Sequence, residues 1–433
     1  MSLSTPPKVR KLQRKLYIKA KEEPEFRFYA LYDKIYREDI LYHAWKLVRH
    51  NGGAPGVDGV SLEDVERRGV HNWLEQLREK LKDKSYRADP VRRVTIPKPS
   101  GGERPLGIPT VEDRVVQMAT KLVIEPLFEA DLEDNAYGYR PERSALDAVK
   151  QVHQQLKKGR TDVVDADLSS YFDTIPHQKV MKSVSTRISD GTVLELIKMW
   201  LKAPIIDEDE DGTKRTEPAG QEGTPQGGVI SPLLANLYMN RFLKYWREQS
   251  YNERLDAKVV NYADDFVILT RANAKRAHQI TKSVMDRLGL TLNEEKTSLV
   301  DATENSFEFL GYELGREYFR KSGRIYWAAQ PSKNSIDRMK RKVKRWLNKA
   351  GGLPWGAVTS KLNQMIEGWA NYFCYDTKTM AYRAIDHYVH EVTSKFLARR
   401  HRTTTSRSRR WTAEKVFGEM GVTRLRDIQL NPD

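Results

Sequence analysis

Two apolar segments that run into aspartates constrain this chain more than any other feature of its sequence. In TDVVDADLSSYFDTI, which starts at Thr161, an alternating apolar run leads to Asp165 and Asp167. In KVVNYADDFVILT, the pair Asp264-Asp265 separates two apolar runs. Aspartate is a poor strand former, and adjacent carboxylates repel each other. A simple turn explains one such segment, whereas a shared cation explains both.

The two acidic segments suit one kind of chemistry. Magnesium prefers hard oxygen ligands and keeps several waters, so a few carboxylates on separate strands suffice to bind it. Two such ions about 4 Å apart promote phosphodiester synthesis, because one activates a 3′-hydroxyl and the other neutralises the leaving pyrophosphate. The sequence therefore predicts that the acids converge from the end of one strand and the turn of a neighbouring hairpin.

The charge balance narrows the choice of partners. The 433 residues include 74 Lys+Arg and 59 Asp+Glu, which gives a net charge of +15. Such a surplus indicates a polyanionic partner, most often a phosphate backbone, with an acidic membrane surface as the alternative. A hydrophobic content of 39% predicts a folded chain, long enough for two or three domains.

Several classes of protein are disfavoured. No apolar run approaches the roughly 20 residues of a membrane span, and the basic N-terminus lacks the apolar core of a secretory signal. Cys374 is the only cysteine, which excludes an internal disulfide and a cysteine-rich zinc site. A reducing interior is the natural setting for such a chain, and we expect no membrane partner.

Hydrophobic periodicity predicts a mixture of helices and strands, and we find no internal repeat. The charged residues 1–25 are predicted to be mobile or only conditionally ordered, and the glycine-rich stretch 51–59 is predicted to be a loop. Strands are predicted for two runs joined by Ser100-Gly101-Gly102, for both acidic segments, and for 307–328. Helices are predicted over about 26–46, from Ser61 to Leu81, and over 112–130, 143–158, 177–202 and 273–289. The acidic stretch Asp207–Gly212 is predicted to be a turn.

The ordered set of motifs resembles the reverse transcriptases encoded by bacterial group II introns. YADD is similar to the catalytic signature of these enzymes, and DLSSYFDTIPH resembles their first palm motif. IPKPSGGERPLGIPT, AYGYRPERSALDAV, GTPQGGVISPLLANLYM and LNEEKT resemble their flanking motifs. Order and spacing match over about 50–330, and the resemblance continues to roughly 375. It implies RNA-directed DNA polymerase activity, in a bacterial, cytoplasmic protein that is associated with RNA or the nucleoid.

The resemblance also implies a fold class, α+β, in the form of a right-hand polymerase. Fingers and an antiparallel palm sheet would be followed by an α-helical thumb, or maturase X domain. The composition shifts after Pro331 towards basic amphipathic helices. We therefore expect a basic extension with helices over 1–50, fingers and palm over 51–330, the helical domain over 331–400, and a basic nucleic-acid-binding tail over 401–433.

The metal ligands follow from the resemblance position by position. Asp167 matches the ligand on the first strand, and Asp264 matches the firm ligand on the hairpin. Asp265 matches the second hairpin acid, with a more supporting role, and the carbonyl of Ala166 is an additional candidate. The implied cofactor is a pair of Mg²⁺ ions, with Mn²⁺ as a substitute. Asp165 and Asp173 are expected to cap or orient their neighbours.

Five residues match positions that handle the incoming nucleotide. Lys98 and Arg104 would clamp the triphosphate, since an ammonium is a point charge and a guanidinium binds phosphate oxygens bidentately. Phe172 matches the steric gate that rejects a 2′-hydroxyl. Ile108 would pack on the templating base, and Gln226 would lie near the nascent base pair. The alternatives are a solvated hairpin tip, a core phenylalanine and a helix-entry loop.

Further basic residues are candidates for nucleic-acid contacts. Arg140 and Arg143 would meet template phosphates, unless they are only surface charges, and Lys296 matches a palm lysine near the primer end. The helix over 336–349 has one apolar face and a basic face that suits a phosphate backbone. The candidates on that face are Arg338, Lys340, Arg341, Lys344 and Arg345.

The C-terminal region extends the resemblance. GWANYF (Gly368–Phe373) resembles the maturase X domain, and RRHRTTTSRSRR (Arg399–Arg410) resembles a short DNA- or RNA-binding tail. The nuclease domain that often follows in the family needs paired cysteines and histidines for its metal. No room or set of ligands for such a domain remains after this region, so we do not expect this chain to cleave the target strand.

The leading interpretation is an RNA-directed DNA polymerase that works with group II intron RNA, in splicing as a maturase and in retromobility as a reverse transcriptase. Its partners would be an RNA template, a DNA or RNA primer and dNTPs, and dimerisation is left open. A host-adopted relative in DNA repair or phage defence is the first alternative. A non-enzymatic splicing factor is disfavoured by the retained acids, and a viral-type RNA polymerase by Phe172 and Ala263.

Overall fold

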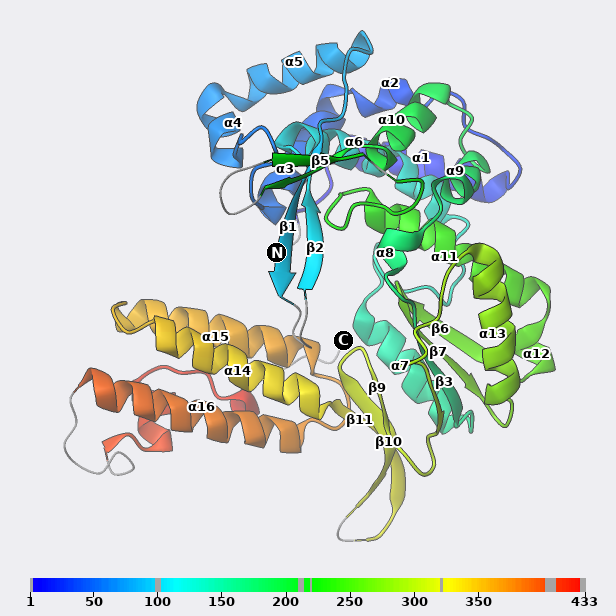
Figure 1. Ribbon diagram of the computed structural model, residues 1–433. Helices are drawn as coiled ribbons and strands as arrows, with labels where there is room; N and C mark the ends of the chain where they lie inside the picture. The colour runs from blue at the N-terminus through cyan, green and yellow to red at the C-terminus, as the bar shows by residue number, and fades with distance from the viewer. Residues whose placement is uncertain are drawn as a thin grey trace.

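The computed structural model describes residues 3–97, 103–208, 214–218, 220–319, 322–401 and 410–428. Figure 1 shows three parts: an N-terminal group of helices from which a hairpin hangs, a central sheet flanked by helices, and a C-terminal group of helices beside them. We call these parts the fingers, the palm and the helical unit. The mixed α+β architecture with antiparallel sheets is the predicted fold class.

The N-terminal segment is an ordered helix, so the prediction of a mobile stretch over 1–25 was wrong. α1 (Pro7–Glu22) buries Val9, Leu16 and Ala20, and Gln13 donates to the Leu122 carbonyl at 3.0 Å. A narrow apolar stripe among many lysines and arginines is enough to pack a helix once a partner helix covers it. That partner is α6 (Val111–Glu129).

The remaining finger helices follow the predictions with one interruption. The structure places α2 (Tyr32–Ile35) and α3 (Glu38–Asn51) in the predicted helical stretch. Ser61 caps the next helix through a capping box with Asp64. Gly69, at φ 89°, then divides the single predicted helix into α4 (Leu62–Arg68) and α5 (Val70–Lys82).

The hanging hairpin belongs to a four-stranded finger sheet in the order β2-β1-β4-β5. β1 (Val91–Pro97) and β2 (Glu103–Ile108) pair antiparallel as predicted. β4 (Ile205–Glu208), parallel to β1, and β5 (Lys214–Glu217) were not predicted. Both strands are short and rich in charged residues. Ion pairs from Arg93 on β1 to Asp207 at 2.8 Å and to Glu217 at 2.9 Å link the strands.

A buried carboxyl at the start of α6 makes the stability of the fingers depend on pH. Asp113 is 2% exposed and accepts hydrogen bonds from the Tyr86 hydroxyl and, at 2.9 Å, from Thr110 Oγ1. Burial raises the pKa of Asp113 from 3.8 to about 6, although these hydrogen bonds oppose the effect. The native state therefore holds this proton more tightly than the unfolded state does.

We expect Asp113→Asn to flatten the pH dependence of unfolding. In the wild type the cost of ionising Asp113 is absent below about pH 4, grows as the pH rises to about 6, and is then constant, on the order of 2–3 kcal/mol. Relative to the wild type, the variant should gain stability over that interval in urea titrations. Parallel curves for the two proteins would contradict the assignment.

The palm sheet has the order β6-β7-β3-β8, and every pair in it is antiparallel. Its strands are β3 (Asp162–Asp167), β6 (Lys258–Tyr262), β7 (Asp265–Thr270) and β8 (Ser298–Asp301), of which β8 was not predicted. Both faces are covered. Val164 and Phe266 pack in the cluster that contains α11 (Ser231–Glu248) and α13 (Ala274–Leu288), whereas Val163 and Val267 pack with α7 (Ala145–Lys157). Double coverage explains the nearly continuous apolar runs.

Short helices and a second sheet complete the palm. Three helices follow β3 in the chain: α8 (Tyr171–Thr174), α9 (His177–Ser185) and α10 (Gly191–Leu201). α12 (Tyr251–Arg254) precedes β6. The three-stranded sheet β11-β10-β9 comprises β9 (Phe307–Phe309), β10 (Tyr312–Tyr318) and β11 (Ile325–Pro331). In Figure 1 this sheet lies between the palm sheet and the helical unit.

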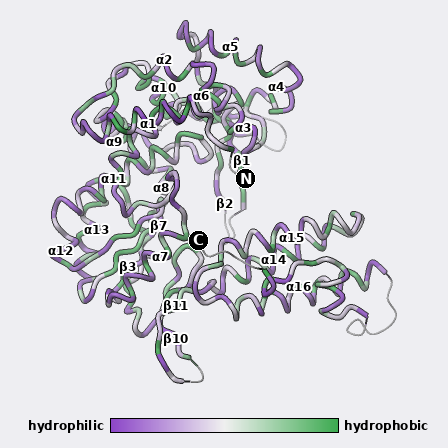
Figure 2. The backbone as a smooth tube through the Cα atoms, turned by 180° about the vertical axis from the view of Figure 1, so that it is seen from behind, coloured by the Kyte–Doolittle hydropathy of each residue, from purple (hydrophilic) through white to green (hydrophobic). Residues whose placement is uncertain are grey.

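The helical unit has its own hydrophobic core. α14 (Lys333–Lys349), α15 (Trp355–Tyr372) and α16 (Thr379–Arg400) contribute Val343, Leu362 and Val389 to it. Purple and green alternate along these helices in Figure 2, as is typical of amphipathic helices. Within the described residues, every helix is too short or too polar to cross a bilayer.

The last described segment packs into this core. Residues 410–428, which include the single turns Lys415–Glu419 and Leu425–Asp427, bury Trp411, Val416 and Leu425 against the helices. We had placed them in a basic tail because the arginine-rich run before them dominates the composition. Most of that run, 402–409, lies outside the described residues.

Candidate active site

The antiparallel register of the palm sheet brings the three candidate acids to one end. β3 pairs with β7 so that Asp167 lies opposite Asp265. β6 and β7 are joined by a two-residue turn, Ala263-Asp264, in which Ala263 has φ 59°. The buried Asn261 side chain donates to the Ala263 carbonyl at 2.8 Å and holds this uncommon backbone conformation. Residues far apart in the chain thus meet at one sheet edge.

Burial and mutual repulsion oppose ionisation of these carboxyls. Burial raises the pKa of Asp265 to about 8, and three neighbouring carboxylates add to the effect. It also raises the pKa of Asp165 to about 7, with Asp167 adding to it, and the pKa of Asp264. A divalent cation at this edge would stabilise the charged forms, so the hard oxygen donors fit such an ion.

One basic residue already contacts the cluster. Lys296 Nζ lies 2.9 Å from Asp167 Oδ2, and the Asn293 backbone N–H donates to the Asp167 carbonyl at 2.8 Å. In the described part of the chain, no three His, Cys, Asp or Glu side chains are already arranged as a metal-holding group. The Lys296 side chain is 65% exposed, so it is free to leave the Asp167 carboxylate.

The fingers bring a guanidinium towards the acidic turn. Arg104, exposed on β2, is close enough for its charge to oppose the raised pKa of Asp264. Lys98, which we expected to act with it, lies outside the described residues. At the other end of β2, the Gly107 N–H donates to the Gln226 carbonyl at 2.6 Å, which sets half-buried Ile108 beside the loop before α11.

The loop before α11 also contacts the segment after β3. Gln226 Nε2 donates to Asp173 Oδ2 at 3.0 Å, and the Thr224 N–H donates to the Phe172 carbonyl at 2.7 Å. Gly227, at φ 112°, lies so close to β2 that a Cβ there would sit 2.3 Å from the Gly107 carbonyl oxygen. These contacts place the loop of Gln226 beside β2, which carries Ile108, and beside the segment of Phe172, so the three expected nucleotide-binding positions surround one loop.

The motif AYGYRPERSALDAV was recognised in the sequence, but sequence reasoning missed that its first residues support the acidic turn from outside. The Asn261 N–H donates to the Asn135 carbonyl at 2.9 Å, and the Tyr137 N–H donates to the Asn261 carbonyl at 2.8 Å. Asn236 Nδ2 holds the Gly138 carbonyl at 2.5 Å, and a Cβ on Gly138 would lie 2.6 Å from the Ala263 nitrogen. The aromatic-glycine-aromatic pattern around Gly138 was the available clue.

Comparison with known proteins assigns this arrangement to a family. Residues 96–314, about half of the chain, match the family described as reverse transcriptase (RNA-dependent DNA polymerase), and residues 336–417 match the group II intron maturase-specific domain. The chain belongs to the group II intron reverse transcriptases. It is therefore an RNA-directed DNA polymerase by family, and that family generally uses divalent metal ions.

Individual relatives cover the reverse transcriptase to different extents. YkfC of Escherichia coli (strain K12) is 37% identical over 350 residues, which span 72% of this chain and 90% of YkfC. The group II intron-encoded protein LtrA of Lactococcus lactis subsp. cremoris is 27% identical over 372 residues, which span 72% of this chain and 60% of LtrA. A telomerase structure from Candida albicans aligns with a TM-score of 0.43 at 12% identity, over 83% of this chain and 68% of the telomerase chain.

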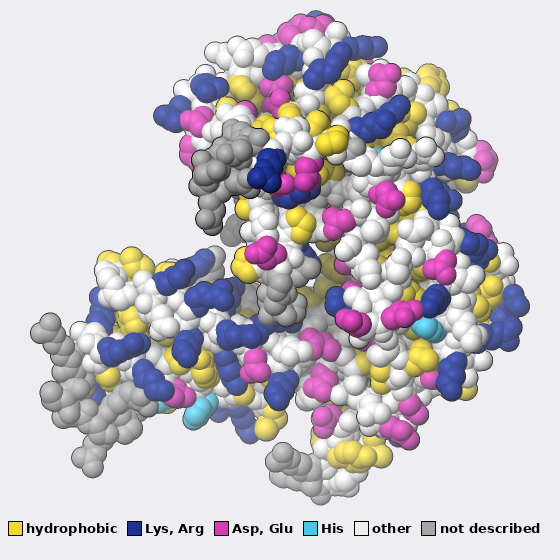
Figure 3. Space-filling model, in the orientation of Figure 1, with side chains coloured by type: hydrophobic (Ala, Val, Ile, Leu, Met, Phe, Trp, Pro, Cys, Tyr) yellow, Lys and Arg dark blue, Asp and Glu magenta, His cyan; other side chains and the backbone are white. Residues whose placement is uncertain are grey.

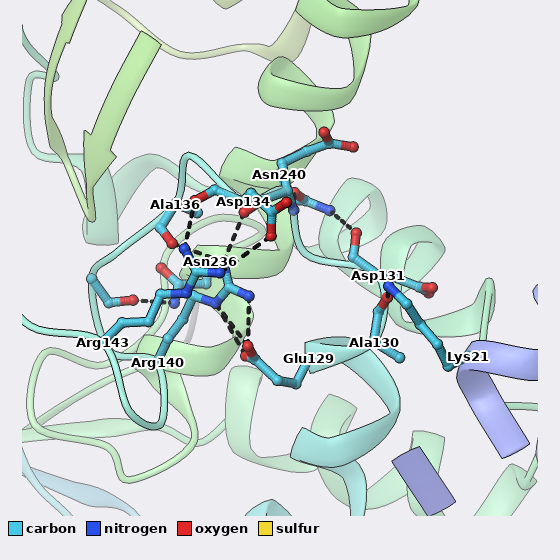
Figure 4. A network of polar contacts seen from close by, with 12 residues as sticks. Lys21, Glu129, Ala130, Asp131, Asp134, Ala136, Arg140, Arg143, Asn236 and Asn240 are labelled. Carbon is cyan, nitrogen blue, oxygen red and sulfur yellow. Dashed lines mark hydrogen bonds and ion pairs between the residues drawn. The ribbon is translucent and has the colours of Figure 1, made fainter. Parts of the chain in front are cut away.

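Figure 4 shows the polar contacts of the two candidate arginines, Arg140 and Arg143, near the palm of this reverse transcriptase. The Arg140 side chain is 4% exposed and binds the Glu129 carboxylate and the carbonyls of Glu133 and Ala136. A buried, fully paired guanidinium does not fit the expected contact with a template phosphate, because its donors are already used. Arg143 is 28% exposed and contacts the Asp134 carboxylate at 3.2 Å, so it remains a candidate.

A groove of about 740 Å³ leads from the catalytic turn of the reverse transcriptase to the helical unit. Asp265 and Glu308 line its palm side, and Arg338 and Lys342 line its α14 side. Figure 3 shows many Lys and Arg side chains on this face of the helical unit, and others on the fingers and the palm. Arg338 lies 3.8 Å from Glu308, across the groove.

The basic residues predicted on α14 divide into two groups. Lys340 lies 3.8 Å from Asp337 and over the Tyr388 ring. Arg341, Lys344 and Arg345 are exposed, and no carboxylate within the described ranges forms an ion pair with them. Their spacing places these three on one helical face, where they present donors to solvent.

Proposed function

We propose that this reverse transcriptase copies group II intron RNA into DNA by extending a DNA or RNA primer with dNTPs, and that it acts as a maturase on the same RNA. The observation that carries the chemistry is the β3–β7 register, which sets Asp167 opposite Asp265 beside the turn that holds Asp264. The maturase-domain match and the unpaired basic face of α14 support the choice of RNA.

The acidic edge provides the metal ligands in this proposal. Asp167 and Asp264 hold two Mg²⁺ ions, or Mn²⁺ as a substitute, with Asp265 and the Ala166 carbonyl in supporting roles. Bound there, the ions would activate the primer 3′-hydroxyl and neutralise the leaving pyrophosphate. Lys296 leaves Asp167 when the primer end arrives, and its ammonium then faces the phosphate of the primer terminus.

The residues around the acids bind the nucleotide and the nucleic acid. Arg104, together with Lys98, binds the triphosphate, and Ile108 and Gln226 pack on the nascent base pair. The Phe172 ring stands against the sugar and excludes a 2′-hydroxyl. Arg143 contacts the template backbone, while the basic face of α14 binds the phosphates of the duplex or of the intron RNA.

Primer extension tests the proposed activity. The purified protein should extend an annealed primer on an RNA template with dNTPs and Mg²⁺, far less with NTPs, and not at all in EDTA. Incubation with a precursor that contains a group II intron should increase the fraction spliced. RNA binding without any extension would favour the non-enzymatic splicing factor, and extension without splicing would favour a host-adopted polymerase.

We expect the exposed face of α14 to supply about three phosphate contacts. Neutralising Arg341, Lys344 and Arg345 to glutamine should reduce the slope of log affinity against log salt concentration by about 2 to 3, because each contact contributes roughly 0.7–0.9. Fluorescence anisotropy with labelled RNA measures the slope. A matched control removes three exposed charges from α13, namely Lys275, Arg276 and Lys282. Equal slopes for the two triple variants would contradict the placement.

A further inference from the structure

Tyr139 is a large aromatic residue that is exposed and has an unfavourable backbone conformation. Its side chain is 48% exposed, and its φ of 54° lies in the left-handed region that residues other than glycine rarely adopt. The preceding residues are fixed to β6 and α11 by the hydrogen bonds of Asn135, Tyr137 and Gly138. A rigid backbone thus presents this ring outward, although exposure gains the fold no burial.

The ring stands next to the proposed gate. The centroids of Tyr139 and Phe172 are 6.3 Å apart with an interplanar angle of 80°, an edge-to-face pair. Phe172 makes a second such contact, at 5.8 Å, with the buried ring of Tyr171. Tyr262, which precedes the catalytic turn, lies 6.4 Å from Tyr139. The Phe172 ring is therefore held between Tyr171 on the inside and Tyr139 on the open side.

The electrostatic surroundings place Tyr139 at the junction of fingers and palm. Burial raises the pKa of the Tyr139 hydroxyl, the carboxylate of Asp264 adds to the effect, and the charge of Arg104 opposes it. The Tyr139 side chain is therefore close to both the acidic turn and the arginine proposed to bind the triphosphate, and its hydroxyl stays neutral near pH 7.

We propose that Tyr139 is a positioning residue for sugar discrimination: its ring holds the Phe172 ring against the place of the nucleotide 2′-carbon. This inference rests on the proposed role of Phe172 as the gate. A ring excludes a hydroxyl by collision only if it cannot turn aside, and Phe172 lies on a helix of one turn, half-buried. Tyr139 closes the side on which that ring is free to move.

Steady-state kinetics on one template base tests the proposal. We expect Tyr139→Ala to lower the ratio of kcat/KM for the dNTP to that for the matching NTP by about two- to tenfold, the range that one edge-to-face pair corresponds to. The change should come mainly from NTP incorporation. Tyr139→Phe should keep the ratio of the wild type, because the ring remains. Tyr42→Ala is the matched control, since Tyr42 on α3 is also 48% exposed.

A double-mutant cycle decides whether Tyr139 acts through Phe172. If it does, adding Tyr139→Ala to Phe172→Ala changes the ratio no further. An equal fall in dNTP and NTP use by Tyr139→Ala, or an additive effect in the double variant, overturns the inference.

The outcomes also separate this inference from the proposals on which it rests. If Phe172→Ala itself leaves the ratio unchanged, the gate assignment is wrong and the inference fails with it. If the wild type does not extend primers at all, the proposed function has failed instead. Thermal melts and Tyr139→Leu, which keeps apolar bulk without a ring, separate loss of folding from loss of the contact.

Discussion

Asp264→Asn reduces the rate of primer extension by at least about a thousandfold, while the metal-free protein becomes no less stable than the wild type. The loss follows because asparagine supplies a neutral amide where the proposed Mg²⁺ ions need a charged oxygen, and metal stabilisation of the transition state amounts to several kcal/mol. Single-turnover extension at saturating dNTP measures it. Asp167→Asn should behave alike, because Asp167 lies at the same sheet edge.

The stability of the same variant separates a functional acid from a structural one. In the wild type Asp264 is a half-buried carboxyl whose pKa is raised by burial, and its charge adds to the raised pKa of Asp265. Neutralising it removes repulsion that the fold otherwise has to tolerate, as is common at active sites. Asp286→Asn, at an exposed position of α13, is the control and should alter neither activity nor stability. An active Asp264→Asn enzyme, or one that melts well below the wild type, would argue against the metal-binding role.

Phe172→Ala should allow the enzyme to incorporate ribonucleotides, and this is the second large effect that we expect. Removing the ring removes the collision with the 2′-hydroxyl, and a collision of a few kcal/mol corresponds to roughly a hundredfold change in discrimination. The ratio of dNTP to NTP incorporation opposite a single template base measures the change. The kcat for dNTPs should fall much less, since Phe172 contacts neither the primer nor the proposed metal ligands in this interpretation.

Phe172→Tyr is the informative comparison for that experiment. It keeps an aromatic ring between Tyr171 and Tyr139, so discrimination should stay near the wild-type value. The core alternative makes the opposite prediction: Phe172→Ala would lower the melting temperature and reduce dNTP and NTP incorporation by one common factor. That pattern would show that Phe172 is a residue of the hydrophobic core and not a steric gate.

Local chemistry explains which parts of the fold were predictable. The acidic segments and the hairpin around 100 were recognised because alternation, glycine turns and adjacent aspartates are properties of a few neighbouring residues. The convergence of the acids was expected from metal chemistry, but the strand register that sets Asp167 opposite Asp265 was not specified by the sequence. α1 was missed because its apolar stripe gains a partner only from α6, a hundred residues later in the chain.

The orientation of the polar residues at the site could not be predicted from local sequence either. A basic motif gave no means of telling that Arg140 would turn inward to Glu129 while Arg143 stayed near the surface. That choice depends on where the end of α6 lies in space. Likewise, Gly138 and Tyr139 acquire their roles from the closeness of the Ala263 backbone, which no local pattern encodes.

The burial of the palm sheet on both faces separates two kinds of motion in this enzyme. β3 and β7 are shielded by helices on one side and by α7 with the second sheet on the other, so their amides belong to the last part of the molecule to open. Arg104 and Phe172 instead lie on a hairpin strand and on a one-turn helix, where Arg104 is exposed and Phe172 is half-buried. We therefore expect adjustment to each new base pair to be confined to the substrate-facing rim, while the carboxylates keep a constant geometry from one addition to the next.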